Sequence, residues 1–72
     1  MERTRVTSSL VRSVGYDAAA RLLEVELVAG EVYRYRDVAP FVYEGLLAAK
    51  SKGTFFNQKI ARRFSYDRVD AR

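Results

Sequence analysis

The sequence predicts an α+β domain: a three-stranded antiparallel β-meander followed by two helices packed on one face of the sheet. Two observations support this prediction. From Leu22 to Arg36, apolar or aromatic side chains alternate with charged ones on either side of Gly30, which is typical of half-buried strands. After Asp37 the apolar residues recur at the spacing of a helix instead. A chain of 72 residues is long enough for one domain.

The first strand is expected from Leu10 to Tyr16 and the second from Leu22 to Val28. The second strand has the cleaner pattern, with Leu23, Val25 and Leu27 on one face and Glu24 and Glu26 on the other. In the first strand, Gly15 suggests either a β-bulge or a close approach of another backbone.

The register of the third strand follows from the length of the turn before it. A two-residue turn places Val25 opposite Arg34 and mixes apolar with charged side chains. A three-residue loop with Gly30 at positive φ instead places Val25 opposite Tyr33, Leu23 opposite Tyr35 and Glu24 opposite Arg34. The second register keeps one face apolar, and we therefore predict it.

The first helix is expected to begin near Pro40, with Asp37 as its cap, and to end at Gly53 in a left-handed conformation. Its buried stripe is Val42, Leu46 and Ala49. Gly45 indicates close packing of this helix against the sheet.

The second helix is expected to begin with Thr54 as its cap and to bury Phe56, Ile60 and Phe64. The residues from Ser65 onward have two open alternatives: a short edge strand, or simple packing of Tyr66 and Val69. We divide the chain into a flexible N-terminal arm, residues 1–8, a single domain, residues 9–69, and a C-terminal tail, residues 70–72.

The composition excludes several classes of function. The sequence has no Cys and no His, which excludes disulfides, Cys/His zinc sites and the commonest catalytic base. We expect no cofactor, no metal and no enzymatic activity. No apolar run is long enough to span a membrane, and no signal peptide follows Met1, so the expected location is cytoplasmic.

The positive charge is unevenly distributed. Residues 1–32 carry four Lys/Arg and five Asp/Glu, whereas residues 33–72 carry nine Lys/Arg and four Asp/Glu. Between Lys50 and Arg63, which we call the basic segment, there are five cations and no acid. Cations gathered on one element indicate a polyanionic partner.

A series of short motifs runs through the chain: Ser9 with Val11, Val14-Gly15-Tyr16, Leu23-Glu24-Val25, Gly30 with Tyr33-Arg34-Tyr35, Asp37-Val38-Ala39-Pro40, and Ser51 to Asn57 with Ile60. In this order and spacing they resemble the KTSC domain, which is named for the C-terminal extension of some lysyl-tRNA synthetases. The central Tyr-x-Tyr is the best-known mark of that family, and the resemblance covers about residues 9–69. It implies a role in binding RNA or another nucleic acid, without established catalytic residues.

Two pairs on the third strand are candidate contacts for nucleic acid. Tyr33 and Tyr35 either form a platform on which unpaired bases stack or belong to the core, and their register favours the core. Arg34 and Arg36 either bind phosphates or pair with the acids that share their face, and the mixed charge favours pairing.

The basic segment is the strongest candidate site. It combines cations with the N-terminus of the second helix, where free N–H groups and the helix dipole favour an anion. A solvated helix face is the alternative. The predicted nucleic-acid-binding residues are Lys50, Lys52, Thr54, Asn57, Lys59, Arg62 and Arg63, with Arg34 and Arg36 on the sheet.

We therefore expect a small non-catalytic module that binds nucleic acid, RNA slightly before DNA, through charge rather than base reading. The alternative is a protein–protein interaction or self-association module. A homodimer is expected, because a small sheet with open edges gains from further burial.

Overall fold

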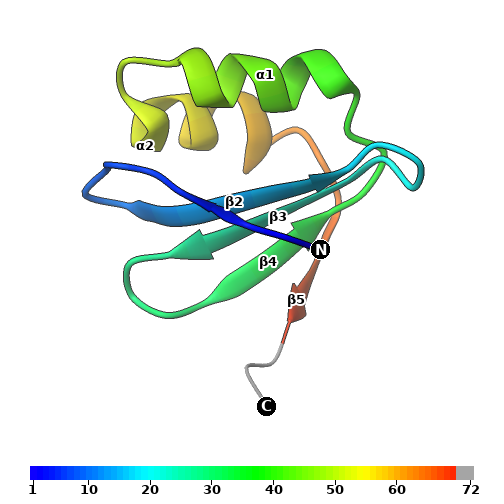
Figure 1. Ribbon diagram of the computed structural model, residues 1–72, viewed down its shortest axis with the longest axis horizontal. Coiled ribbons are helices and arrows are strands. Elements are labelled where there is room, and N and C mark those ends of the chain that lie inside the picture. Colours follow the sequence, from blue (N-terminus) through cyan, green and yellow to red (C-terminus); the bar gives the residue numbers. More distant parts are fainter. Residues whose placement is uncertain (70–72) are drawn as a thin grey trace.

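The computed structural model describes residues 1–69, which form two layers: a sheet and a helical layer that covers one of its faces (Figure 1). The sheet is antiparallel and five-stranded, in the order β1 (Thr4–Arg5), β2 (Val11–Asp17), β3 (Leu22–Leu27), β4 (Val32–Tyr35) and β5 (Tyr66–Val69). The α+β class is confirmed, whereas the predicted number of three strands is wrong.

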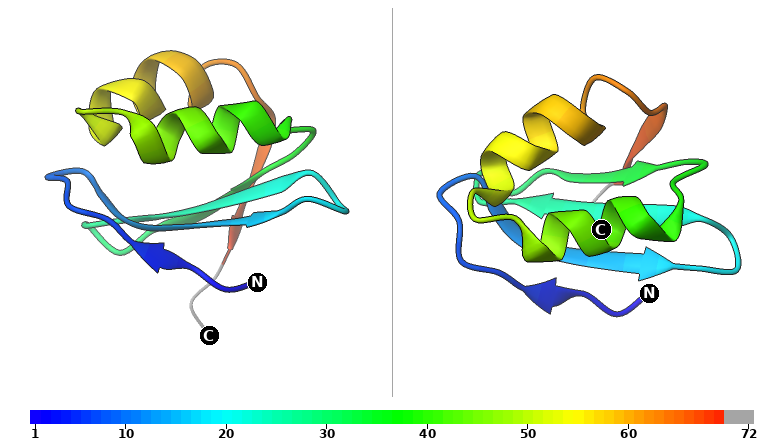
Figure 2. Two further views of the ribbon diagram at one scale, coloured as in Figure 1. Left: turned by 45° about the horizontal axis from the view of Figure 1, so that its top comes forward. Right: turned by 90° about the horizontal axis from the view of Figure 1, so that it is seen from above.

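The two additional strands lie at the edges of the sheet (Figure 2). β1 pairs with β2 and falls within the segment expected to be an arm. β5 pairs with β4, with Tyr66 opposite Tyr35 and Val69 opposite Val32, so the edge-strand alternative for this segment is correct. Neither edge strand has a periodic sequence, because each is held by the unpaired backbone groups of its neighbour. The predicted tail, residues 70–72, lies outside the described residues.

The register of the central strands is as predicted. Val25 lies opposite Tyr33, Leu23 opposite Tyr35 and Glu24 opposite Arg34. The turn between β3 and β4 is closed by the N–H of Gly30, which donates to the carbonyl oxygen of Leu27 at 2.9 Å. Gly30 has a φ of +113°, in the region that L-residues rarely adopt.

Gly15 is needed because another backbone lies against it. A Cβ built on Gly15 would be 2.5 Å from the carbonyl oxygen of Glu2, which leads into β1. The bulge in β2 lies elsewhere, between Val11 and Ser13. Of the two explanations for this glycine, close backbone approach is therefore correct.

The helical layer consists of α1 (Pro40–Ala48), α2 (Lys52–Phe55) and a π-helical turn, η1 (Phe56–Ile60), which continues α2. The predicted caps are wrong. Ala39, without a side-chain hydrogen bond, precedes α1, and Asp37 instead has a φ of +59° in the preceding loop. The N-cap position falls on Ala39, two residues after Asp37, and Pro40 at the start of the helix has no N–H that needs a cap.

The boundary between the helices also differs from the prediction. α1 ends before Gly53, and Gly53 lies inside α2. Ser51, not Thr54, caps α2, because its Oγ accepts the N–H of Thr54 at 3.3 Å. Ser51 lies three residues before Thr54, which is the spacing at which an N-cap side chain reaches a free N–H of the first turn. The helix therefore begins about one turn earlier than predicted.

Gly45 allows close packing, but against α2 rather than the sheet. A Cβ on Gly45 would be 2.9 Å from Cζ of Phe55. The absence of a side chain at this position therefore lets the Phe55 ring lie directly on α1.

The core lies between the two layers. Leu23, Val25 and Tyr35 of the sheet meet Leu46, Phe56 and Ile60 of the helical layer, and all six are buried. The remaining buried core residues are Val11, Val14 and Val38. Phe64, the third residue of the predicted second stripe, is half-buried against this cluster.

The start of α1 is fixed over β2 by one aromatic pair. The rings of Tyr16 and Tyr43 stack with centroids 5.1 Å apart, and the Tyr16 hydroxyl donates to the carbonyl oxygen of Val38. Among the described residues, no helix is long and apolar enough to cross a bilayer.

Candidate nucleic-acid interface

The five cations of the basic segment all lie in or beside α2 and η1, which together we call the second helical element. Lys50 is in the link after α1, Lys52 begins α2, Lys59 is in η1, and Arg62 and Arg63 follow it. All except Lys52 are exposed. Lys52 is half-buried and donates from Nζ to the carbonyl oxygen of Ala49 at 2.9 Å, where it neutralises the negative end of α1.

Ion pairing distinguishes these cations from Arg34 and Arg36, the two predicted site residues outside the basic segment. Within residues 1–69 the ion pairs are Arg34–Glu24 at 2.9 Å, Arg3–Glu24 at 3.8 Å and Arg36–Asp67 at 3.6 Å. None of them involves the basic segment. Within residues 1–69, the exposed cations of the basic segment therefore have no carboxylate partner.

Arg34 and Arg36 do not join the basic segment. Arg34 alternates along β4 with Tyr33 and Tyr35, which pack toward the helices, so it points to the opposite face of the sheet. Arg36 follows β4 and pairs with Asp67, which lies opposite Arg34. Arg34 donates from Nη2 to the carboxylate of Glu24, a residue that is only 7% exposed. The Nε of Arg34 is buried without a hydrogen-bond partner among the described residues. The predicted site residues therefore fall on two separate faces.

The start of α2 offers less to an anion than expected. The Ser51 hydroxyl occupies the N–H of Thr54 and also donates to Thr54 Oγ1 at 2.9 Å. Thr54 is thus engaged within the helix rather than capping it. Asn57, one turn later, is exposed on η1.

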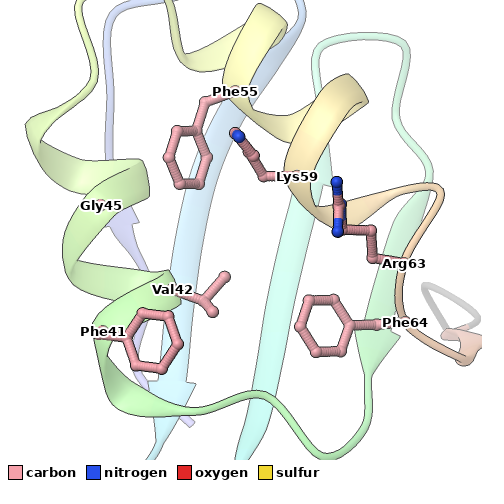
Figure 3. Close-up of a pocket in the computed structure, with 7 residues that line it drawn as sticks. All are labelled: Phe41, Val42, Gly45, Phe55, Lys59, Arg63 and Phe64. Carbon is pink, nitrogen blue, oxygen red and sulfur yellow. The ribbon is translucent and has the colours of Figure 1, made fainter.

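A groove of about 490 Å³ lies between α1 and the second helical element (Figure 3). We call it the interhelical groove. One wall is Phe41, Val42 and Gly45 of α1. The other wall is formed by Phe55, Lys59, Arg63 and Phe64. The structure therefore brings two of the predicted cations, Lys59 and Arg63, together with three phenylalanines.

The phenylalanines of this groove were not predicted as site residues from the sequence. Phe41 lies beside the Val42/Leu46 stripe and Phe55 precedes the buried Phe56, so in the sequence both resemble ordinary core positions. A signal was nevertheless present in the spacing. Phe41 and Gly45 are four residues apart, as are Phe55, Lys59 and Arg63, and this spacing places residues on one helix face.

The tyrosines of β4 belong to an aromatic cluster rather than to an open platform. Tyr35 is 3% exposed and packs edge-on against Phe56, with centroids 5.7 Å apart. Tyr33 is half-buried and packs edge-on against Tyr66 at 5.1 Å. Burial, with smaller effects of Tyr66 and Tyr33, raises the pKa of Tyr35 to about 12. The core interpretation of Tyr35 is therefore correct.

The described residues contain no group of three or more His, Cys, Asp or Glu side chains that could hold a metal ion. The arrangement instead provides cations beside an aromatic groove, which suits a ligand with both negative charge and flat apolar surface.

Comparison with known proteins identifies the fold and its relatives. An uncharacterized protein of Stutzerimonas stutzeri (strain A1501) is 44% identical over 71 residues, which cover 97% of this chain and 100% of that protein. A crystal structure of a KTSC domain protein from Yersinia pestis is 33% identical, with a TM-score of 0.91 over 96% of this chain and 97% of the other.

A third relative is larger. A lysine–tRNA ligase of Nostoc punctiforme is 34% identical over 61 residues, which are 85% of this chain and 11% of the ligase. The family model of the KTSC domain matches residues 7–64. The resemblance carried by the sequence motifs is thus confirmed: this chain belongs to the KTSC domain family.

Proposed function

We propose that this chain is a non-catalytic module that binds nucleic acid, RNA before DNA, through phosphate contacts of the basic segment. The observation that carries the proposal is the cluster of exposed cations in the basic segment, none of which pairs with a carboxylate within residues 1–69. Arg34 and Arg36 are paired with acids across the sheet, whereas Lys59, Arg62 and Arg63 are exposed and, within residues 1–69, make no ion pair. Exposed cations without acidic neighbours attract phosphates and release the counterions of the nucleic acid.

The preference for RNA is supported by one relative. The name of the Nostoc punctiforme protein states that it acts on tRNA, and this chain matches 11% of it. Because the matched part is a small fraction of the ligase, the support concerns the domain as an accessory to RNA recognition and not the ligase reaction. The absence of His and Cys from the sequence is consistent with a binding role.

Protein binding is the second candidate, and one observation favours it. Phe41 is 74% exposed and lines the interhelical groove together with Val42, Phe55 and Phe64, which offers an apolar surface to a protein partner. Homodimerisation through the edges of β1 or β5 is a related proposal, which sedimentation at high protein concentration would check. A cytoplasmic location stays a prediction.

A titration of labelled single-stranded RNA and DNA at several salt concentrations tests the proposal. With four phosphate contacts, the logarithm of the binding constant should fall against the logarithm of salt with a slope of roughly −3 to −4. The triple variant K59Q/R62Q/R63Q should flatten this slope by about 2–3 units and weaken different sequences about equally. A protein-binding module that uses apolar contacts predicts no such slope.

The matched control removes the same charge from the sheet. The variant R5Q/R36Q/R68Q replaces three exposed arginines outside the basic segment and should change the slope by less than about one unit. Equal effects of the two triple variants would mean that net charge alone causes binding. If the wild-type chain binds neither RNA nor DNA at about 50 mM salt, where phosphate contacts are strongest, the proposal fails.

A further inference from the structure

We propose that the interhelical groove receives an unpaired base of single-stranded nucleic acid, while Lys59 and Arg63 hold the adjoining phosphate. This inference rests on the proposed function and makes it more specific. It assigns a role to Phe41, Phe55 and Phe64, which phosphate binding by itself does not use.

The walls of the groove differ in chemistry. The α1 wall is uncharged, and the opposite wall carries both cations between the rings of Phe55 and Phe64 (Figure 3). Phe41 closes the groove from α1 and is 74% exposed, so its ring is available to a ligand without disturbing the core. None of the residues within 1–69 that line the groove is acidic. Its charge therefore complements an anion that carries an apolar group.

Gly45 and Phe55 form one end of the groove, where the Phe55 ring packs on the side-chain-free surface of Gly45. The volume of the groove, about 490 Å³, lies within the range of small-ligand sites, about 300–1,000 Å³. A flat base is a suitable occupant, because bases stack on aromatic side chains regardless of sequence.

The groove also predicts which feature of the base is recognised. Apart from Lys59 and Arg63, the lining residues in the described part of the chain have no hydrogen-bonding side-chain groups. Base edges therefore find few side-chain partners, and stacking decides the affinity. Different bases should bind with similar affinity, and a duplex, whose bases are already stacked, should bind more weakly than a single strand.

The test compares a short labelled oligoadenylate RNA with an abasic strand of the same length, which keeps the phosphates and lacks the bases. The wild-type chain should bind the oligoadenylate about tenfold more tightly. F41A should abolish this difference and leave the salt slope unchanged, because no phosphate contact is lost. F41L, which keeps an apolar side chain but not the ring, should behave like F41A.

L47A is the matched control, because Leu47 is an exposed apolar residue of α1 outside the groove. L47A should change neither the affinity for the oligoadenylate nor the affinity for the abasic strand. Thermal melting should show that F41A, F41L and L47A all fold.

If the wild-type chain binds both strands equally with a steep salt slope, the proposed function stands and the groove proposal is wrong. If neither strand binds, both fail. If F41A abolishes binding of a Glu- and Leu-rich peptide but leaves oligoadenylate affinity unchanged, the groove belongs to a protein partner and the proposal is overturned.

Discussion

Arg34 and Glu24 lie directly opposite each other on neighbouring strands, and their side chains meet at 2.9 Å over the face of the sheet that the helices leave open. Glu24 is 7% exposed, so its carboxylate depends on this partner and, at 3.8 Å, on Arg3. Arg34 therefore acts within the fold, and its position makes it a weak candidate for phosphate binding.

Replacing Arg34 tests this role. R34M keeps most of the apolar stem and should lower the free energy of unfolding by about 1–3 kcal/mol, because it leaves a buried carboxylate short of a partner. Urea unfolding would measure the change. In the matched variant R36M, the lost ion pair is exposed on both sides, and the expected cost is about 0–1 kcal/mol. Equal costs for the two variants would contradict the structural role of Arg34.

The contact of Gly15 with the N-terminal strand predicts a cost that depends on residues 1–3. G15A should lower the free energy of unfolding by about 1–3 kcal/mol, because a methyl group would overlap the backbone of Glu2. In a chain that lacks residues 1–3, the same substitution should cost less, and the difference measures the contact. An equal cost in both chains would show that this contact does not restrict position 15.

Gly30 predicts a cost that comes from the backbone alone. Apart from Gly30 and its two chain neighbours, no described residue has an atom within 4 Å of a Cβ built at this position, so G30A introduces no clash with the rest of the fold. We expect a loss of about 1 kcal/mol from the positive φ, measured by urea unfolding. D-alanine, introduced by chemical synthesis, favours positive φ and should be at least as stable as glycine. Destabilisation by D-alanine equal to that by L-alanine would refute this explanation.

The hydroxyl of Tyr35, a residue that is only 3% exposed, predicts a loss of stability at high pH. Its pKa is raised to about 12 in the folded chain, mainly by burial, against about 10 in the unfolded chain. As the pH rises, the unfolded chain therefore releases this proton first. The contribution is fully present below about pH 10 and is lost between about pH 10 and pH 12.

Comparing unfolding at two pH values isolates this group. Between about pH 9 and pH 11, Tyr35 should account for a loss of about 1.4 kcal/mol. Y35F removes the ionisable hydroxyl and keeps the ring against Phe56. Over the same pH interval, the free energy of unfolding of Y35F should therefore fall by about 1.4 kcal/mol less than that of the wild type. An identical decline in Y35F and the wild type would show that Tyr35 is not the titrating group.

The central architecture could be predicted from local sequence pattern. Alternation set the faces of β3 and β4, and the turn at Gly30 set their register, because a slip of one residue would have placed arginines on the apolar face. The absence of acids between Lys50 and Arg63 likewise indicated the candidate interface from the sequence alone. The strand faces, the register and the charge distribution depend on residues that are close together in the sequence, so they can be predicted from the local sequence pattern.

The tertiary structure decided what depends on distant neighbours. β1 and β5 exist because adjacent strands offer unpaired backbone groups, and the sequences of these two edge strands do not show this. Arg34 and Arg36 were set apart from the basic segment by Glu24 and Asp67, which lie on other strands. The interhelical groove appeared only when the Phe41 face of α1 met the Lys59 face of η1, because a groove needs two walls and each helix encodes one.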